Sequence, residues 1–183
     1  MATCLITGAN RGLGFEFSRQ LLGAGHDVFA LCRKPDEAEG LQELQKSSLN
    51  SNCSGTLAIR KGDVSDEESL EEVAKGLDEL DVLINNAGIM GQREIKLSEL
   101  QLDQLTQVMD INVCGIIRAV RRFLPALRKG QDKRIVNITS LMGSISDNNS
   151  GRYSAYRISK AGVNMLTRNL GHDLVAEGFT VLA

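Results

Sequence analysis

The sequence predicts an α/β protein with three layers, in which helices cover both faces of a doubly wound parallel sheet. Two observations predict this. Short apolar, β-branched runs alternate with longer amphipathic stretches along the whole chain, as in successive strand–helix–strand units. The expected strands also read as largely continuous apolar runs, as strands buried on both faces do. No repeat or linker divides residues 1–183, so one domain is expected.

The first strand is expected at Ala2–Thr7 (ATCLIT), an apolar run, and an amphipathic helix at Phe15–Leu22. Val28–Cys32 (VFALC) predicts the second strand. A short polar helix is expected at Glu37–Gln45. The polar segment Lys46–Gly55 (KSSLNSNCSG) is expected to form a loop.

The third strand is predicted within Thr56–Gly62. Ser65 stands three residues before Glu68, which is the spacing of a capping box, so a helix is expected from there to about Leu80. The fourth strand is predicted at Val82–Ile84.

A long helix is expected at Leu105–Leu127 and a fifth strand at Arg134–Ile138. A second long helix is expected at Tyr156–Glu177, and a sixth strand begins at Thr180–Ala183. Because the chain stops inside this strand, we expect the last strand to be incomplete and the chain to be truncated at its C-terminus.

The composition excludes several classes of function. Lys and Arg number 21 against 23 Asp and Glu, a net charge of −2, which argues against nucleic-acid binding through bulk charge. No apolar run approaches the roughly 20 residues that cross a bilayer. The four cysteines are scattered without metal-ligand spacing, and they favour a reducing, cytoplasmic location; they are Cys4, Cys32, Cys53 and Cys114.

A glycine-rich turn joins the first strand to the first helix. Gly8, Gly12 and Gly14 have the spacing G-x-x-x-G-x-G. Glycines let the backbone approach a diphosphate closely, and a helix N-terminus offers free N–H groups to it. The alternative is an ordinary glycine-rich turn.

The end of the second strand indicates which dinucleotide would bind. An NAD site places an acid there, about 20 residues after the glycines. This chain instead has Arg33, and Arg11 lies inside the glycine turn. Either guanidinium could bind a 2′-phosphate, so NADP(H) is expected unless both are merely surface arginines.

Two further segments follow expected strands. Asp63 and Val64 follow the third strand. Asp63 could accept a hydrogen bond from adenine or could equally be a turn residue. Asn86, Ala87 and Gly88 follow the fourth strand, where small residues would let a ligand pass near the backbone, although such a turn is common after any strand.

Tyr156 and Lys160 stand four residues apart and would share one face of a helix. A nearby ammonium favours the phenolate, so the tyrosine could exchange a proton with a carbonyl oxygen. Ser140 ends the fifth strand and could hydrogen-bond the reacting oxygen. Asn112 falls on the apolar stripe of a long helix; it is either a satisfied core amide or the anchor of a water that leads to Lys160.

Taken together, these motifs resemble the short-chain dehydrogenase/reductase family over the whole chain. The sequence of residues 137–148 and 156–160 is similar to that of the sniffer-type carbonyl reductases and the C-factor-like branch. The resemblance implies a Rossmann fold with strand order 3-2-1-4-5-6-7. It also implies dimerisation through the helices at 105–127 and 156–177.

The resemblance further implies a role for each motif. Tyr156 would be the general acid/base, Lys160 would lower its pKa and bind the nicotinamide ribose, Ser140 would orient the carbonyl and Asn112 would anchor a water. The cofactor would be held by the remaining motif residues, which are Gly8, Arg11, Gly12, Leu13, Gly14, Asp63, Val64, Asn86, Ala87 and Gly88.

Two departures from the family stand out. Tyr156 follows Ser140 by 16 residues, a few more than the family spacing, so Thr139 is an alternative for the serine role. The substrate lid and seventh strand are expected to be missing. The expected function is NADPH-dependent reduction of a ketone, aldehyde or quinone. The alternative is a non-catalytic NADP(H)-binding or signalling protein, or an inactive truncated isoform.

Overall fold

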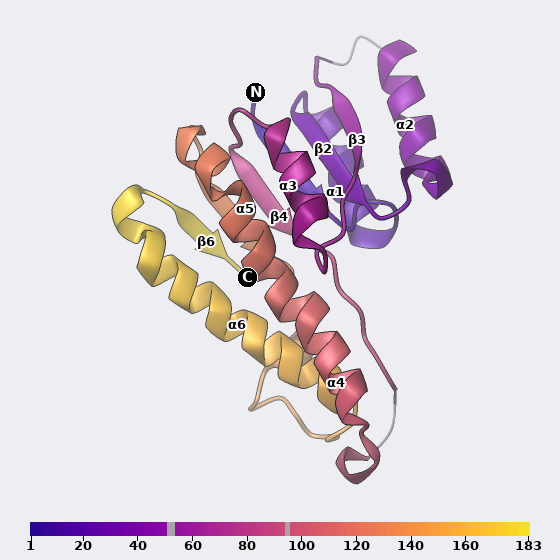
Figure 1. Cartoon of the computed structure of the whole chain (residues 1–183), viewed down its shortest axis with the longest axis vertical. Helices are drawn as coiled ribbons and strands as arrows, with labels where there is room; N and C mark the ends of the chain where they lie inside the picture. Colours follow the sequence, from indigo (N-terminus) through magenta and orange to yellow (C-terminus); the bar gives the residue numbers. More distant parts are fainter. Residues whose placement is uncertain (51–53, 94–95) are drawn as a thin grey trace.

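The computed structural model describes residues 1–50, 54–93 and 96–183 and confirms the α/β architecture. Within these ranges a six-stranded sheet has the order β3-β2-β1-β4-β5-β6, with every neighbouring pair parallel (Figure 1). This is the order that the resemblance implies for these six strands. The strands are β1 Thr3–Thr7, β2 Asp27–Cys32, β3 Leu57–Lys61, β4 Val82–Asn85, β5 Arg134–Asn137 and β6 Thr180–Leu182.

The helices lie between the strands along the chain, as the alternation predicts. They are α1 Gly12–Gly23, α2 Glu39–Asn50, α3 Glu67–Lys75, α4 Leu102–Met109, α5 Gly115–Lys129 and α6 Ser154–Leu174. Short helical turns are η1 Pro35–Glu37, η2 Leu97–Glu99, η4 Leu141–Gly143 and η5 Val175–Glu177, and η3 Asp110–Cys114 is π-helical. In Figure 1, α4 and α5 form one long run with α6 beside it.

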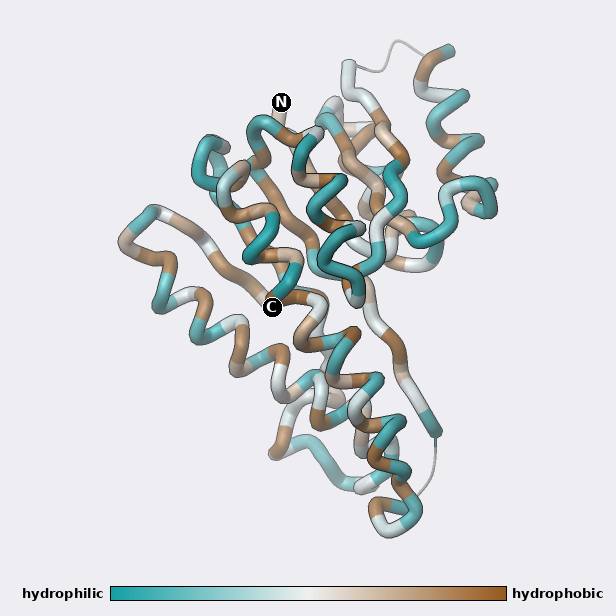
Figure 2. The backbone as a smooth tube through the Cα atoms, viewed as in Figure 1, coloured by the Kyte–Doolittle hydropathy of each residue, from teal (hydrophilic) through white to brown (hydrophobic). Residues whose placement is uncertain are grey.

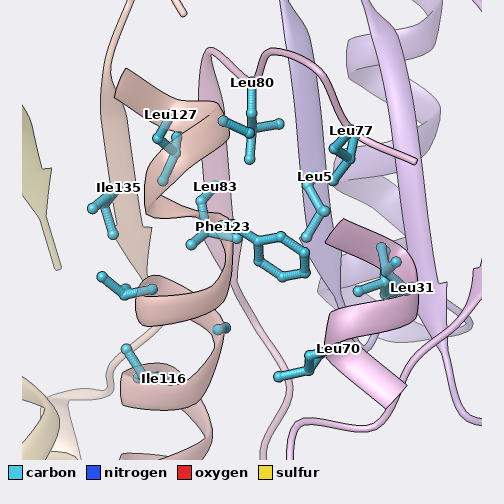
Figure 3. Close-up of a cluster of buried hydrophobic side chains, with 14 of the residues drawn as sticks. Leu5, Leu31, Leu70, Leu77, Leu80, Leu83, Ile116, Phe123, Leu127 and Ile135 are labelled. Atoms are coloured by element: carbon cyan, nitrogen blue, oxygen red, sulfur yellow. The ribbon is translucent and has the colours of Figure 1, made fainter. Parts of the chain in front are cut away.

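Successive strand residues point to opposite faces of the sheet, and each face has its own core. Leu5 belongs to the cluster under α3, α5 and α6, whereas Ile6 belongs to the cluster under α1 and α2. Phe123 of α5 is fully buried and lies at the centre of the first cluster, beside Leu83 (Figure 3). In Figure 2 the strands are mostly hydrophobic in colour, whereas hydrophobic and hydrophilic colours alternate along the helices.

The strand order determines where a ligand would bind at the edge of the sheet. The chain crosses from β3, at one edge, back past β1 to β4. The carboxyl ends of β1 and β4 are therefore adjacent at the point where the winding reverses, and ligands of open α/β sheets bind there. The glycine turn follows β1, and Asn86–Gly88 follows β4.

The predicted loop at Lys46–Gly55 is wrong in its first part. Residues 46–50 continue α2, because no proline or glycine occurs from Leu41 to Asn50 and the apolar side of the helix, with Leu41 and Leu44, packs on the sheet. Residues 51–53, which include Cys53, lie outside the described part of the chain.

The predicted capping box of the third helix is also wrong. Asp66 is the N-cap of α3, and its carboxylate accepts hydrogen bonds from the backbone N–H groups of Glu68 and Ser69. Ser65 instead donates its hydroxyl proton to Asp63. The helix ends at Lys75 rather than near Leu80, since Gly76 follows as its C-cap.

The two long helices are confirmed with changes inside them. The helix predicted at 105–127 runs from Leu102 to Lys129 but contains the π-helical segment η3, which adds a wider turn at Asp110–Cys114. The helix predicted at 156–177 is α6 followed by η5.

In the described ranges, no helix is both long enough and apolar enough to span a bilayer. The cysteines described, Cys4, Cys32 and Cys114, are free thiols.

Candidate active site

The glycine turn after β1 is open toward solvent at one glycine and closed at the other two. Gly12 has φ +56°, and a side chain there would meet nothing within 4 Å. A Cβ on Gly8, with φ +67°, would lie 2.9 Å from Ala87 Cα. A Cβ on Gly14 would lie 2.5 Å from both Asn86 Nδ2 and Gly8 O. Gly8 and Gly14 thus allow close packing inside the protein, and Gly12 leaves the outer side of the turn clear.

The turn is fixed by the segment that follows β4. Asn86 Nδ2 donates to Thr7 O and Gly8 O, each at 3.0 Å. In return, the backbone N–H groups of Asn86 and Ala87 donate to Thr7 Oγ1 at 3.0 and 3.1 Å. Asn86 and Ala87 of the predicted Asn86–Gly88 motif therefore brace the glycine turn.

Arg11 and Arg33 are both exposed and lie beyond the carboxyl ends of β1 and β2. Across the described residues neither guanidinium has an ion-pair or hydrogen-bond partner, whereas the neighbouring Lys34 is paired with Glu37 at 2.7 Å. Leu13 is 61% exposed at the start of α1. The two arginines are thus available cations on the side of the sheet where the glycine turn lies.

Asp63 forms a turn after β3, as one of its two interpretations predicted. Its Oδ1 accepts from Ser65 N at 2.9 Å and from Ser65 Oγ at 2.7 Å. Val64 is buried against Gly115, where a Cβ would come within 2.9 Å of Val64 Cγ2. Arg118 also donates to Val64 O at 3.3 Å and to Asp110 Oδ1 at 2.5 Å, so η3 and α5 hold this turn in place.

Asn112 lies in the π-helical segment and is 1% exposed. Its Oδ1 accepts from Ile89 N at 2.8 Å, and its two N–H groups donate to Ile89 O at 2.8 Å and Ser159 Oγ at 2.9 Å. Both donors are therefore used inside the protein, as for a satisfied core amide. A water could only donate to Oδ1, so the anchoring of a water stays a prediction.

Lys160 is 5% exposed and donates from Nζ to Ile138 O at 2.7 Å. Among the described residues no carboxylate pairs with it. Burial lowers the pKa of its ammonium below the ordinary value. Nζ lies 5.6 Å from the centroid of the Tyr156 ring, so the predicted pair shares one face at the start of α6.

Tyr156 is half-buried, and its hydroxyl has no hydrogen-bond partner among the described residues. Its backbone oxygen accepts from Ser159 Oγ at 2.8 Å, and Ser159 in turn accepts from Asn112. One chain of hydrogen bonds therefore links η3 to the turn of α6 that carries Tyr156.

The hydroxyls of Thr139 and Ser140 differ in whether their protons are bound within the protein. Thr139 Oγ1 lies 2.6 Å from Asn164 Oδ1 and donates to it. Ser140 Oγ only accepts, from Met142 N at 3.2 Å. The Ser140 proton therefore has no acceptor in the described part of the chain and is available to a ligand.

A buried chain of side chains behind this edge was not predicted. Asn85 donates to Asn137 Oδ1 at 2.8 Å, and Asn137 donates to Thr167 Oγ1 at 2.9 Å. It ties the carboxyl ends of β4 and β5 to α6. The signal was present in the sequence, since each asparagine ends an apolar strand, but only the pairing of Asn85 with Asn137 in register shows that they meet. Ser159 was likewise overlooked.

Comparison with known proteins gives one family. The family model of short chain dehydrogenases matches residues 2–183. A curated relative, 1-hydroxy-2-glutathionyl-2-methyl-3-butene dehydrogenase of Rhodococcus sp. (strain AD45), is 35% identical over all of this chain and 75% of its own length.

Two solved structures have the same fold at similar coverage. Carbonyl reductase Sniffer of D. melanogaster superposes with a TM-score of 0.90 at 28% identity, over 99% of this chain and 78% of its own. The NADPH-bound carbonyl reductase from chicken fatty liver gives 0.85 at 32% identity, over 99% of this chain and 74% of its own.

Proposed function

Since the chain belongs to the short-chain dehydrogenase family, we propose that it is an NADPH-dependent carbonyl reductase in which Tyr156 is the general acid. The observation that carries the proposal is the buried Lys160, which has no carboxylate partner among the described residues and lies beside the Tyr156 ring. Burying a cation without a counter-charge is costly. Such a residue is typical of a functional site rather than of a stabilising core.

The glycine turn supports binding of the dinucleotide. Gly12 leaves open space beside the N-terminus of α1, where a diphosphate would meet free N–H groups and the positive end of the helix dipole. Arg11 and Arg33 are available for a 2′-phosphate, and no acid directly follows β2 to repel one. When bound, NADPH supplies the hydride.

Lys160 supports the acid role of Tyr156 through its charge. An ammonium near the phenol stabilises the phenolate that remains after proton donation. Nζ donates one of its three N–H bonds to Ile138 O, which leaves two for a ribose hydroxyl. We assign Lys160 both roles.

Ser140 supports orientation of the substrate. It lies at the end of the sheet where ligands bind, and its hydroxyl proton has no acceptor in the described residues, so it can donate to a carbonyl oxygen. Tyr156 then transfers its own proton to that oxygen as the alcohol forms. Thr139 is less suited because its proton is held by Asn164.

The test separates turnover from binding. NADPH oxidation is followed with a panel of ketones, aldehydes and quinones, for the parent chain and for Tyr156→Phe. We expect turnover with the parent and at least a hundredfold loss with Tyr156→Phe, while the rise in melting temperature caused by NADPH is the same in both. Turnover that survives in Tyr156→Phe would refute the assigned acid.

Binding of NADPH without turnover of any carbonyl by the parent chain would instead favour the non-catalytic alternative. A larger thermal shift with NADH than with NADPH would refute the assignment of Arg11 and Arg33.

We also propose a cytoplasmic homodimer that pairs the faces of α4–α5 and α6. Exposed apolar residues on these helices support the pairing: Ile117 is 38%, Ile158 44% and Met165 63% exposed. Sedimentation velocity of the parent and Met165→Glu tests it, and a monomeric parent would refute it.

A further inference from the structure

The segment between the hydroxyls of Ser140 and Tyr156 is bonded near both of its ends by one side chain, that of Arg157. It starts directly after Ser140 with η4 and ends where α6 begins, two residues before Tyr156 (Figure 1). A carbonyl that reaches both hydroxyls would therefore lie near the two ends of this segment. The far part of this loop is exposed from Ile145 to Arg152, and Ile145 is 87% exposed.

Arg157 bonds to both ends of this loop. Its Nε donates to Arg152 O at 2.9 Å, one terminal nitrogen donates to Met142 O at 3.4 Å, and the other donates to Ser150 Oγ at 3.2 Å. Met142 lies at the beginning of the loop, and Ser150 and Arg152 lie at its end. The guanidinium thus closes a loop of eleven residues, 142–152, against the first turn of α6.

Other hydrogen bonds printed for the described residues hold one part of the loop or the other. Asn164 holds the start of the loop through Gly143 O at 3.4 Å, and Gly143 packs so closely on α6 that a Cβ would lie 2.8 Å from Lys160 C. Within the loop, Asp147 N donates to Ser144 Oγ and Gly151 N to Asn148 Oδ1. These bonds shape each half, but they do not join the two ends.

We propose that Arg157 is a positioning residue that fixes the substrate-side wall of the site by joining the ends of loop 142–152. This rests on the proposed function, because the loop is a substrate wall only if Ser140 and Tyr156 act on a carbonyl. A planar guanidinium reaches three acceptors in fixed directions. A lysine at this position would supply one donor centre and could not hold both ends equally well.

The first test needs no turnover. Hydrogen exchange of the backbone amides in residues 143–153 is measured for the parent, Arg157→Met, Arg157→Lys and the control Arg168→Met, which alters an exposed arginine further along α6. We expect exchange about tenfold faster in Arg157→Met, equivalent to about 1.4 kcal/mol, a smaller increase in Arg157→Lys and none in the control. Unchanged exchange in Arg157→Met at an unchanged melting temperature would overturn the proposal.

The second test asks whether the wall selects substrates. With saturating NADPH, we expect Arg157→Met to raise KM for carbonyls about tenfold and to reduce the preference between small and bulky ones, with kcat within about threefold and the NADPH dissociation constant unchanged. An equal loss for all carbonyls in kcat, with KM unchanged, would overturn the positioning role. If exchange is faster in Arg157→Met but the parent chain reduces no carbonyl, the proposed function is refuted, while the joining of the loop ends by Arg157 is supported.

Discussion

Gly12 and Gly14 stand two residues apart, yet alanine should damage the protein in different ways at the two positions. At Gly14 a methyl group would lie 2.5 Å from Asn86 Nδ2 and 2.5 Å from Gly8 O. Carbon does not approach nitrogen or oxygen so closely, so Asn86 must move and lose its hydrogen bonds to Thr7 O and Gly8 O. At Gly12 the methyl group would meet nothing within 4 Å.

The expected magnitudes follow from these contacts. For Gly14→Ala, overpacking costs about 2 kcal/mol, and two lost hydrogen bonds cost about 1 kcal/mol each. The higher helix propensity of alanine returns about 1 kcal/mol. The free energy of unfolding should therefore fall by about 3 kcal/mol, which for a chain of this size lowers Tm by about 6–12 °C. For Gly12→Ala, the positive φ costs about 1 kcal/mol and lowers Tm by about 2–4 °C.

The assay pairs thermal unfolding of the cofactor-free protein with a titration by NADPH fluorescence. Gly12→Ala should weaken NADPH binding at least tenfold, because its methyl group occupies the space beside the helix N-terminus that the diphosphate needs. A Gly14→Ala protein that melts within 2 °C of the parent would refute the packing argument. Normal NADPH affinity in Gly12→Ala would refute the placement of the diphosphate.

Three other predictions concern separate parts of the molecule. Burial alone would raise the pKa of Asp81, but the backbone N–H groups of Thr3, Gln131 and Asp132 lower it overall. Its stabilisation is thus present above about pH 4 and lost as pH falls through the folded pKa. Asp81→Asn should unfold about 1–3 kcal/mol more easily at pH 7, and denaturant melts should show this deficit shrinking toward pH 2. Arg33→Ala should weaken NADPH about ten- to hundredfold and leave NADH unchanged in fluorescence titrations. Ser140→Ala should lower kcat/KM about a hundredfold with an unchanged melt, while Thr139→Ala should lose about 1 kcal/mol of stability with near-parental kinetics; the reverse pattern would exchange their roles.

The strands were predictable because they are short, largely apolar runs, and that pattern depends on sequence alone. Their order was not derivable from it and came from the resemblance to a family. Helix ends were predicted less well, since they depend on single local contacts. Asp66 and Ser65 are adjacent and both can cap, and only the folded backbone shows that Asp66 stands at the N-cap position while Ser65 lies in the turn with Asp63.

The types of the site residues were predictable, but not which of their atoms are available. Asn112 was conspicuous as a polar residue on an apolar stripe. Its partners Ile89 and Ser159 lie 23 and 47 residues away in the chain, and the π-helical turn that directs it between them leaves no pattern in composition or periodicity. Arg157 shows the same limit, because only the folded loop brings its three acceptors within reach of one guanidinium.

The assignment of roles at this edge follows from which hydrogen-bonding groups the fold has already used. Thr139 and Asn112 have their protons bound within the protein, so they hold elements together. Ser140 and Tyr156 retain free hydroxyl protons in the described structure, and Lys160 uses only one of its three donors. Hydrogen-bonding groups that have partners in the protein thus surround a few donors that a ligand can use. In the proposed reduction, such preorganised donors would lower the barrier. For this reason conservative changes at the satisfied positions should mainly reduce stability, whereas those at Ser140, Tyr156 and Lys160 should mainly reduce turnover.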